Sequence, residues 1–533
     1  MNFHFPATAK LTDLQSGESL CANALLARVS EWQQKLDALA AKKVLLLSPG
    51  NLEWALVDLA CLASETVLVP LPTYLSESQF SYILQTVEPD VILSSRALEL
   101  PGFQLDSCYA GLWLYRQQDI QTQVDVGRAA LALPQGCQKI TFTSGSTGTP
   151  KGVCLSAQTQ FQVAQSLVER IGIQQPRHLC LLPLSTLLEN IAGIYAPLLA
   201  GGEVLLTEEQ HRGFTGSSLS HPQKLLALIS NTKPQTLILV PELLQLLVLA
   251  CQQGWQAPKS LLFIAVGGAR VAPELLTAAS KVGLPVYQGY GLSECGSVVA
   301  LSVKSALTAN PHELLAVGKT LAHLQVKIVD GELWVKTPFL GYLADAAEQL
   351  QASQQQTATQ HTAQQQGAAM PGSGWVATGD LASLDNEGNL TILGRKKNLL
   401  ISSLGRNIHP EWVEAELLKN GLIQQAVLFG DAKPYCTALV YCHNPAVSQE
   451  QVQSWVDSVN ASLPDYARVQ KIHLLQKPLS EAEGTLTANQ RPKRVAIAAH
   501  YAAEIHAMYQ SGAGTTCVEA APVSLQAATD FSV

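Results

Sequence analysis

The chain has 533 residues, of which 47% are hydrophobic and only 14% are charged, and its formal net charge is −8. This length predicts more than one domain, and the apolar content excludes a chain that is disordered throughout. No block of Lys and Arg is present, so we expect no nucleic-acid partner. No apolar run reaches about 18 residues and no secretory signal pattern opens the chain, so we expect no integral membrane association.

The cysteines and histidines favour a reducing compartment without a structural metal site. The eleven cysteines are scattered, odd in number and without a C-x-x-C pair, which is typical of free thiols in a cytoplasmic protein. The twelve histidines are dispersed without metal-ligand spacing, so we expect no structural zinc.

The first part of the chain alternates short apolar runs with longer amphipathic ones. The predicted strands are 43–47, 66–70, 90–93, 202–206, 236–240, 261–266 and 284–287. Helices are predicted between the first of these, at 52–62 and 76–87. Strands that alternate with helices of ten or more residues indicate a parallel sheet with crossover helices, so the predicted fold class is α/β.

The pattern changes after about residue 330. Residues 331–343 are predicted as strand, turn and short strand, and residues 349–369 form a Gln-rich insertion. Residues 395–510 form a second, smaller unit with predicted helices at 411–418, 448–463 and 495–508 and strands at 426–429 and 438–442. We therefore predict an α/β domain at 1–394, an α+β domain at 395–510 and a frayed tail at 511–533.

One loop carries the strongest chemical signal, the string TFTSGSTGTPKG at 141–152. Glycines let the backbone approach an anion closely, hydroxyl groups add hydrogen-bond donors, and Lys151 adds a positive charge for phosphate. It is not a Walker A loop, because Pro150 replaces the second glycine of that motif. The candidate phosphate ligands are Thr143, Ser144, Gly145, Ser146, Thr147, Gly148 and Lys151.

This loop resembles the phosphate-binding signature of the acyl-adenylate-forming superfamily, which includes the fatty acyl-CoA synthetases. Four further strings follow in the family's order: GGA at 267–269, YGLSE at 290–294, TGD at 378–380 and GRKKN at 394–398. The resemblance covers about residues 30–505. It implies a large adenylate-forming domain with a small mobile C-terminal domain, and ATP, Mg²⁺ and CoA as cofactors and substrates.

The resemblance also implies roles for individual residues. The loop and Lys151 would hold the β- and γ-phosphates, and Gly267, Gly268 and Ala269 would lie beside the adenine. Tyr290, followed by Gly291, would lie against the adenine face, where an aromatic ring supplies stacking. Ser293 would reach the α-phosphate or the carboxylate of the acid.

The remaining implied roles concern the metal, the ribose and the hinge. Glu294 would hold Mg²⁺, which prefers carboxylate and phosphate oxygens. Asp380 would accept hydrogen bonds from the ribose hydroxyls, and Arg395 would donate to ribose or phosphate. Lys397 corresponds to the family's hinge residue, about which the small domain rotates between two half-reactions.

The sequence departs from the family pattern at two positions, Arg491 and Thr186. Arg491 stands where relatives carry a late catalytic Lys, and Lys493 is an alternative substitute two residues away. We hypothesise that Arg491 contacts the acyl and α-phosphate oxygens during adenylation. Thr186 replaces a His near the acid pocket, and we interpret Glu189 as a surface residue rather than an aid to Mg²⁺ binding.

The apolar strings around the expected pocket favour a medium- or long-chain fatty acid as substrate. We expect the helix at 240–250 and the string LPLSTLLENIAGIYAPLLAGG at 182–202 to adjoin it. A lipid substrate would allow peripheral membrane contact, but no basic amphipathic helix supports it. Two alternatives stay open: a fatty acyl-AMP ligase that loads an acyl carrier protein, and a non-catalytic acyl or nucleotide binder.

Overall fold

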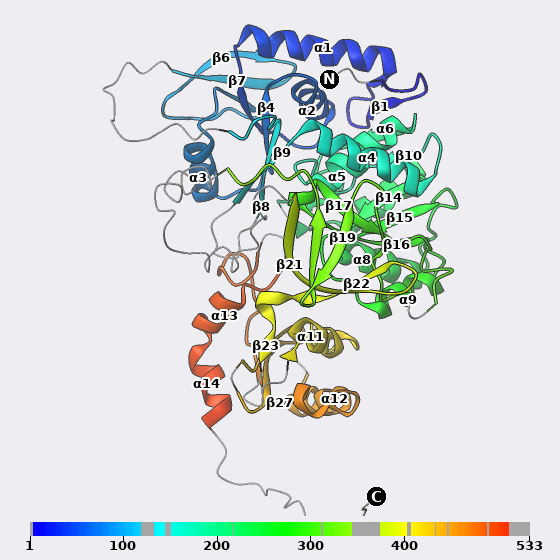
Figure 1. Cartoon of the computed structure of the whole chain (residues 1–533), viewed down its shortest axis with the longest axis vertical. Helices are drawn as coiled ribbons and strands as arrows, with labels where there is room; N and C mark the ends of the chain where they lie inside the picture. Colours follow the sequence, from blue (N-terminus) through cyan, green and yellow to red (C-terminus); the bar gives the residue numbers. More distant parts are fainter. Residues whose placement is uncertain are drawn as a thin grey trace, which may run out of the picture. The chain divides into compact units, whose positions relative to one another are not determined.

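The computed structural model describes residues 4–118, 133–143, 151–216, 218–310, 313–343, 374–401, 407–431, 433–444, 447–487 and 490–510. The chain divides into two compact units, a larger unit Met1–Leu399 and a smaller unit Leu400–Val533 (Figure 1). The insertion predicted at 349–369 and the tail predicted at 511–533 lie outside the described residues.

The first sheet of the larger unit has seven strands in the order β6-β7-β5-β3-β4-β8-β9. Their bounds are β3 Lys43–Leu47, β4 Val67–Leu71, β5 Val91–Ser94, β6 Phe103–Tyr109, β7 Leu112–Gln117, β8 Lys139–Thr143 and β9 Lys151–Leu155. Strands β4, β3 and β5 are parallel neighbours, joined through helices α2 (Leu52–Leu62) and α3 (Glu77–Val87). The α/β class predicted from the alternating pattern is therefore confirmed.

The second sheet has thirteen strands, and its parallel half runs β1-β11-β10-β14-β15-β16. These strands are β1 Lys10–Asp13, β10 Arg177–Leu179, β11 Glu203–Leu206, β14 Thr236–Leu239, β15 Phe263–Val266 and β16 Val286–Leu292, with β2 Ser19–Cys21 at the edge. The antiparallel half contains β17 Ser297–Leu301, β18 Gly318–Thr320, β19 Gln325–Val329, β20 Glu332–Lys336, β21 Trp375–Leu384 and β22 Asn389–Arg395. Figure 1 shows these green and yellow strands apart from the blue and cyan strands of the first sheet.

Helices connect and cover the two sheets. They are α1 Ala22–Ala38, α4 Ala157–Ile171, α5 Leu187–Glu189, α6 Ala196–Leu199, α7 Pro222–Thr232, α8 Pro241–Gln252 and α9 Pro273–Lys281, with 3-10 turns η2 Ser293–Cys295 and η4 Lys396–Asn398. Ser156 caps α4 by accepting from the Thr159 N–H, which satisfies one of the free donors at a helix start. A two-stranded sheet joins β12 Phe214–Thr215 to β13 Ser218–Leu219.

A buried ion pair joins elements that are far apart in the sequence. Lys139 at the start of β8 lies 2.6 Å from Asp58 on α2, and both side chains are almost fully buried. Asn190 and Tyr195, at the two ends of the π-helix η1 (Asn190–Tyr195), also hydrogen-bond to both charged groups. Burial lowers the pKa of Lys139, and the negative charge of Asp58 opposes this shift.

The smaller unit is built on the three-stranded sheet β25-β26-β27. Its elements are β23 Leu400–Ile401, β24 Asn407–Ile408, α11 Pro410–Leu418, β25 Gln425–Phe429, β26 Cys436–Tyr441, α12 Gln449–Ser462, η5 Asp465–Ala467, β27 Val469–Leu474, α13 Arg494–His500 and α14 Ala502–Gln510. The single helix predicted at 495–508 is wrong, because the chain breaks at Tyr501 into α13 and α14.

Among the helices of the described residues, none is both long and apolar enough to cross a membrane.

The buried pair makes a testable contribution to the stability of the larger unit. Lys139→Met should lower the free energy of unfolding by about 3–5 kcal/mol, because it leaves the Asp58 carboxylate buried without its cation. Urea unfolding measures this change. The matched control is Lys304→Met, which breaks the exposed Lys304–Glu313 pair and should cost no more than about 1 kcal/mol. Equal losses in the two variants would contradict the prediction.

Candidate active site

The YGLSE segment lies where the parallel half of the second sheet meets the antiparallel half. Strand β16 pairs in parallel with β15 and antiparallel with β17, and its register shifts between Tyr290 and Gly291. A Cβ atom on Gly291 would lie 1.8 Å from the backbone oxygen of Ser297, so only glycine fits there. Ser297 itself has φ of +114°, a strained value for a non-glycine residue. The backbone of this segment is therefore held in one tightly packed conformation.

Tyr290, Asp380 and Arg395, the three residues for which the resemblance implies contacts with the nucleotide, form one polar cluster. The Tyr290 hydroxyl donates to Asp380 Oδ2 at 2.5 Å, and Arg395 Nε lies 2.9 Å from Asp380 Oδ1. Strands β21 and β22 place Asp380 directly opposite Arg395, which explains the ion pair between them. Burial and the negative charge of Asp380 raise the pKa of Tyr290 well above its usual value, so the phenol stays protonated.

Glu294 belongs to a second cluster that the sequence did not reveal. The Tyr342 hydroxyl donates to Glu294 Oε1 at 2.6 Å, and Lys151 Nζ lies 5.3 Å from the centre of the Tyr342 ring. Tyr342 is held there because residues 341–343 pair with β9, through an antiparallel bridge to Val153. The string FLGY before the Gln-rich segment is the signal that could have indicated it.

The phosphate loop is described only at its two ends. Thr143 closes β8 and faces Lys151 at the start of β9, so these two candidates lie opposite each other. The candidates between them, Ser144, Gly145, Ser146, Thr147 and Gly148, lie outside the described residues. Lys397 has a described backbone in η4, but nothing is described of its side chain.

The GGA segment follows the carboxyl end of β15, beside the YGLSE segment. Gly268 has φ of +80°, which favours glycine, and a Cβ atom on Gly267 would lie 3.2 Å from the Gly289 oxygen. Ala269, the third residue, is half-buried. Gly267, Gly268, Gly291 and Ser293 all line one pocket.

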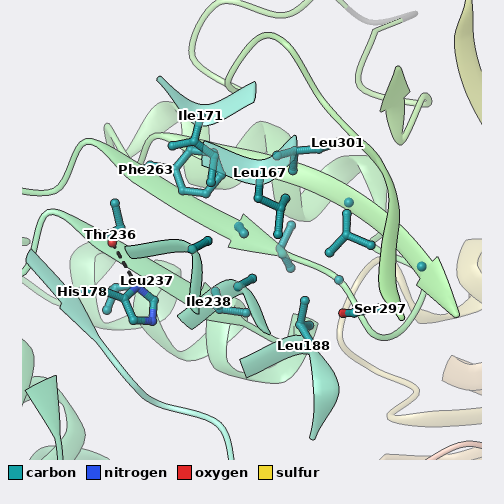
Figure 2. Close-up of a pocket in the computed structure, with 18 of the residues that line it drawn as sticks. Leu167, Ile171, His178, Leu188, Thr236, Leu237, Ile238, Phe263, Ser297 and Leu301 are labelled. Carbon is teal, nitrogen blue, oxygen red and sulfur yellow. Dashed lines mark hydrogen bonds between the residues drawn. The ribbon is translucent and has the colours of Figure 1, made fainter. Parts of the chain in front are cut away.

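This pocket is a largely apolar cavity of about 190 Å³. Its lining comes from α4, α6, the segment 186–192 and strands β14 to β17, and includes Leu167, Ile171, Leu188, Ile238, Phe263 and Leu301 (Figure 2). Thr186 and the string at 182–202 adjoin the pocket, as expected. Residues 240–250 contribute none of this lining, but α8 packs Leu243, Leu244 and Leu247 into a core cluster that shares Leu237, Ile238 and Val266 with the pocket wall.

One wall of the pocket is polar and buried. His178 bonds through Nδ1 to Thr236 Oγ1 at 2.9 Å and through Nε2 to Glu189 Oε1 at 3.0 Å. Glu189 is fully buried, so its interpretation as a surface residue is wrong: its other oxygen accepts from the Leu182 N–H. His178, Cys180 and Glu189 also bring ligand atoms within 4.8 Å of one another, a cluster that sequence spacing did not reveal. Each of these three side chains has a hydrogen-bond partner within the protein, so we assign no metal to this cluster.

The late basic residues belong to the smaller unit. Arg491 is exposed, and Lys493 is half-buried. Arg494 has a structural role instead, since it lies 2.6 Å from the buried Glu414 and donates to the Leu428 carbonyl. Arg491 and Lys493 therefore remain the two candidates for the late cation.

The larger unit combines a tyrosine–carboxylate–arginine cluster, a second carboxylate bonded to a tyrosine whose ring lies near a lysine, and a largely apolar pocket lined by Ser293. With the α/β fold, these features define an adenylate-forming enzyme. The chain belongs to the AMP-binding enzyme family: the family profile matches residues 22–343, and the profile of the family's C-terminal domain matches residues 397–513. Its predicted membership of the acyl-adenylate-forming superfamily is thereby confirmed.

The chain is similar to several characterised relatives. It is 25% identical to a long-chain-fatty-acid–CoA ligase of Mycobacterium bovis, over 89% of each chain. It is 26% identical to a 2-succinylbenzoate–CoA ligase of Bacillus subtilis, over 78% of this chain and 75% of the relative. Its fold matches the O-succinylbenzoate coenzyme A synthetase of Bacillus subtilis in complex with AMP, with a TM-score of 0.69 and 23% identity. The match covers 92% of this chain and 95% of the synthetase.

The close packing at Gly291 is open to a direct test. Gly291→Ala should abolish ATP–pyrophosphate exchange and lower the melting temperature, because the new Cβ atom meets the Ser297 oxygen at 1.8 Å. Gly289→Ala is the matched control on the same strand, where the nearest atom to a new Cβ is 3.5 Å away. Calorimetric unfolding and the exchange assay measure both variants. A Gly291→Ala enzyme with the stability and exchange rate of the control would contradict this account.

Proposed function

We propose that the protein uses ATP to convert an apolar carboxylic acid into an acyl-AMP and then transfers the acyl group to CoA. The observation that carries the proposal is that neighbouring residues, Ser293 and Glu294, belong to the pocket lining and to the second polar cluster. Ser293 lines the pocket, while the next residue, Glu294, belongs to the cluster with Tyr342 and Lys151. An acid held in the pocket would thus present its carboxylate beside the groups suited to a nucleotide phosphate.

The donor sets fit ATP and Mg²⁺. Glu294 offers a carboxylate oxygen, the type of ligand that Mg²⁺ takes together with substrate phosphates, and the Tyr342 hydroxyl orients it. Lys151 supplies a positive charge for phosphate oxygens. A carboxylate has about four lone-pair positions, so Asp380 can accept from ribose while it keeps Tyr290 and Arg395. When bound, Mg²⁺ would offset negative charge on the phosphates.

The pocket favours an acid of medium size. Its volume of about 190 Å³ modestly exceeds the roughly 150 Å³ of an apolar cavity that binds benzene. We therefore propose a medium-chain fatty acid, or an acid with one ring, rather than a long-chain fatty acid. The names of the relatives do not decide between a fatty acid and an acid with a ring, because one is named for a long-chain fatty acid and one for 2-succinylbenzoate.

CoA is the acceptor that the relatives support, since both are named as CoA ligases. The carrier-protein alternative has no comparable support. We propose that Lys397 acts as the hinge between the two half-reactions, because it lies within η4, close to the end of the larger unit at Leu399.

A panel of carboxylic acids tests the proposed function. Straight-chain acids from acetic to stearic acid, together with aromatic acids, are incubated with ATP, Mg²⁺ and CoA, and pyrophosphate release and thioester mass are recorded. We expect both products, with an optimum at medium-chain or single-ring acids. Pyrophosphate release without a CoA thioester would overturn the acceptor, and no pyrophosphate release with any acid would overturn the proposal as a whole.

The late cation gives a sharper test of the adenylation step. Arg491→Ala should slow pyrophosphate release by about a hundredfold, the usual effect of removing one preorganised donor to developing negative charge. Lys493→Ala is the matched control from the same loop and should change the rate little. Single-turnover kinetics with the best acid of the panel measure both variants. The hypothesis is wrong if Arg491→Ala keeps the wild-type rate, and a loss in Lys493→Ala alone would assign the role to Lys493.

A further inference from the structure

The apolar pocket contains a polar group at the end away from Ser297. Figure 2 shows Thr236 and His178 at one end of the lining and Ser297 at the other. Both polar side chains are buried, with exposed fractions of 6% for Thr236 and 1% for His178. A pocket meant only for hydrocarbon gains nothing from such groups, because buried polar atoms lose free energy unless they find partners.

The hydrogen bonds of this group leave one position open to a ligand. One oxygen of Glu189 accepts the Leu182 N–H, and His178 Nε2 lies 3.0 Å from the other oxygen. In the tautomer that directs the Nε2 proton to Glu189, His178 Nδ1 accepts the Thr236 hydroxyl proton, at 2.9 Å. Within the described part of the chain, Thr236 Oγ1 makes no other hydrogen bond, so its lone pairs remain available in the pocket wall.

The surrounding backbone keeps this arrangement in place. A Cβ atom on Gly193 would lie 2.3 Å from Glu189 Oε1 and 2.8 Å from His178 Nε2, so glycine makes room for the pair. Three elements therefore contribute to one preorganised group: β10 with His178, β14 with Thr236, and α5 with Glu189.

The register of the sheet sets the distance of this group from the reacting end. Thr236 pairs with Phe263 at the amino ends of β14 and β15, whereas Gly267 follows the carboxyl end of β15. At about 3.3 Å per residue, the strand from Thr236 to Leu239 is roughly 10 Å long. A ligand group that reaches Thr236 thus lies at the far end of the acid from its carboxylate.

We propose that Thr236, oriented by His178 and Glu189, is a specificity subsite for a hydroxyl group at the distal end of the acid. The inference rests on the proposed function and names the class of its substrate: ω-hydroxy or para-hydroxyphenyl alkanoic acids of medium length. A hydroxyl group suits the site because it can donate to Thr236 Oγ1.

Matched acid pairs test the subsite. The pairs are ω-hydroxyoctanoic against octanoic acid, and para-hydroxyphenylpropanoic against phenylpropanoic acid. Wild-type enzyme should favour the hydroxylated member of at least one pair by about tenfold in kcat/KM, the effect of one net hydrogen bond. Thr236→Val should reduce this ratio to about one, while Thr236→Ser should restore it. Thr232→Val, a buried threonine on α7 outside the pocket lining, should leave the ratio unchanged.

The ratio between paired acids separates recognition from a merely structural role, since a loss of stability lowers both members alike. Equal use of both members of both pairs by wild type would overturn the inference, as would an unchanged preference in Thr236→Val. Calorimetric binding of the same pairs without ATP provides a second readout that decides the inference in the same way. A hydroxyl preference in binding without pyrophosphate release would support the subsite and overturn the proposed function alone.

Discussion

The buried Asp58–Lys139 pair is the contact that links the two ends of the candidate site. Lys139 begins β8, which leads in five residues to Thr143 at the phosphate loop. Asn190 and Tyr195, which complete the network, begin and end η1, and the neighbouring residues Ala192 and Ala196 line the pocket. A π-helix bonds residues five apart, so one such turn brings Asn190 and Tyr195 to the same charged pair. The strand that ends at Thr143 and the helical segment that lines the pocket thus share one buried polar network.

Such a pair is a costly way to stabilise a protein, because the desolvation of two charges can offset their attraction. We interpret its role as the selection of one packing arrangement. Apolar side chains at these four positions could pack in several arrangements, whereas four polar groups that hydrogen-bond to one another allow only one arrangement. We interpret the network as the reason why a short irregular helix, α5 through α6, holds a fixed position between the two sheets.

The sequence predicted those features that depend on local pattern. The helix at 52–62 and the strand at 43–47 have the predicted bounds, because unbroken apolar runs between turn residues determine them. The family resemblance implied nucleotide-binding roles for Tyr290 and Asp380, but their contact was not predicted, since 90 residues separate the two. The role of Tyr342 and the burial of Glu189 were missed for the same physical reason. Both depend on contacts that form only when the chain folds, and no local sequence pattern indicates them. The break at Tyr501 shows that helical periodicity can continue across a helix end.

The pocket also explains how one fold serves relatives that are named for different acids. An apolar wall distinguishes acids that differ by a methylene by only about 10- to 200-fold, whereas a buried hydrogen-bonding group discriminates far more strongly. A few wall residues can therefore change the substrate while the polar cluster of Tyr290, Asp380 and Arg395, for which we propose a nucleotide-binding role, stays the same. Since the relatives share only about a quarter of their residues with this chain, the lining of its own pocket is a better guide to its acid than their names. That lining is largely apolar, and the buried His178–Thr236 pair at the end away from Ser297 is the feature from which substrate choice is best argued.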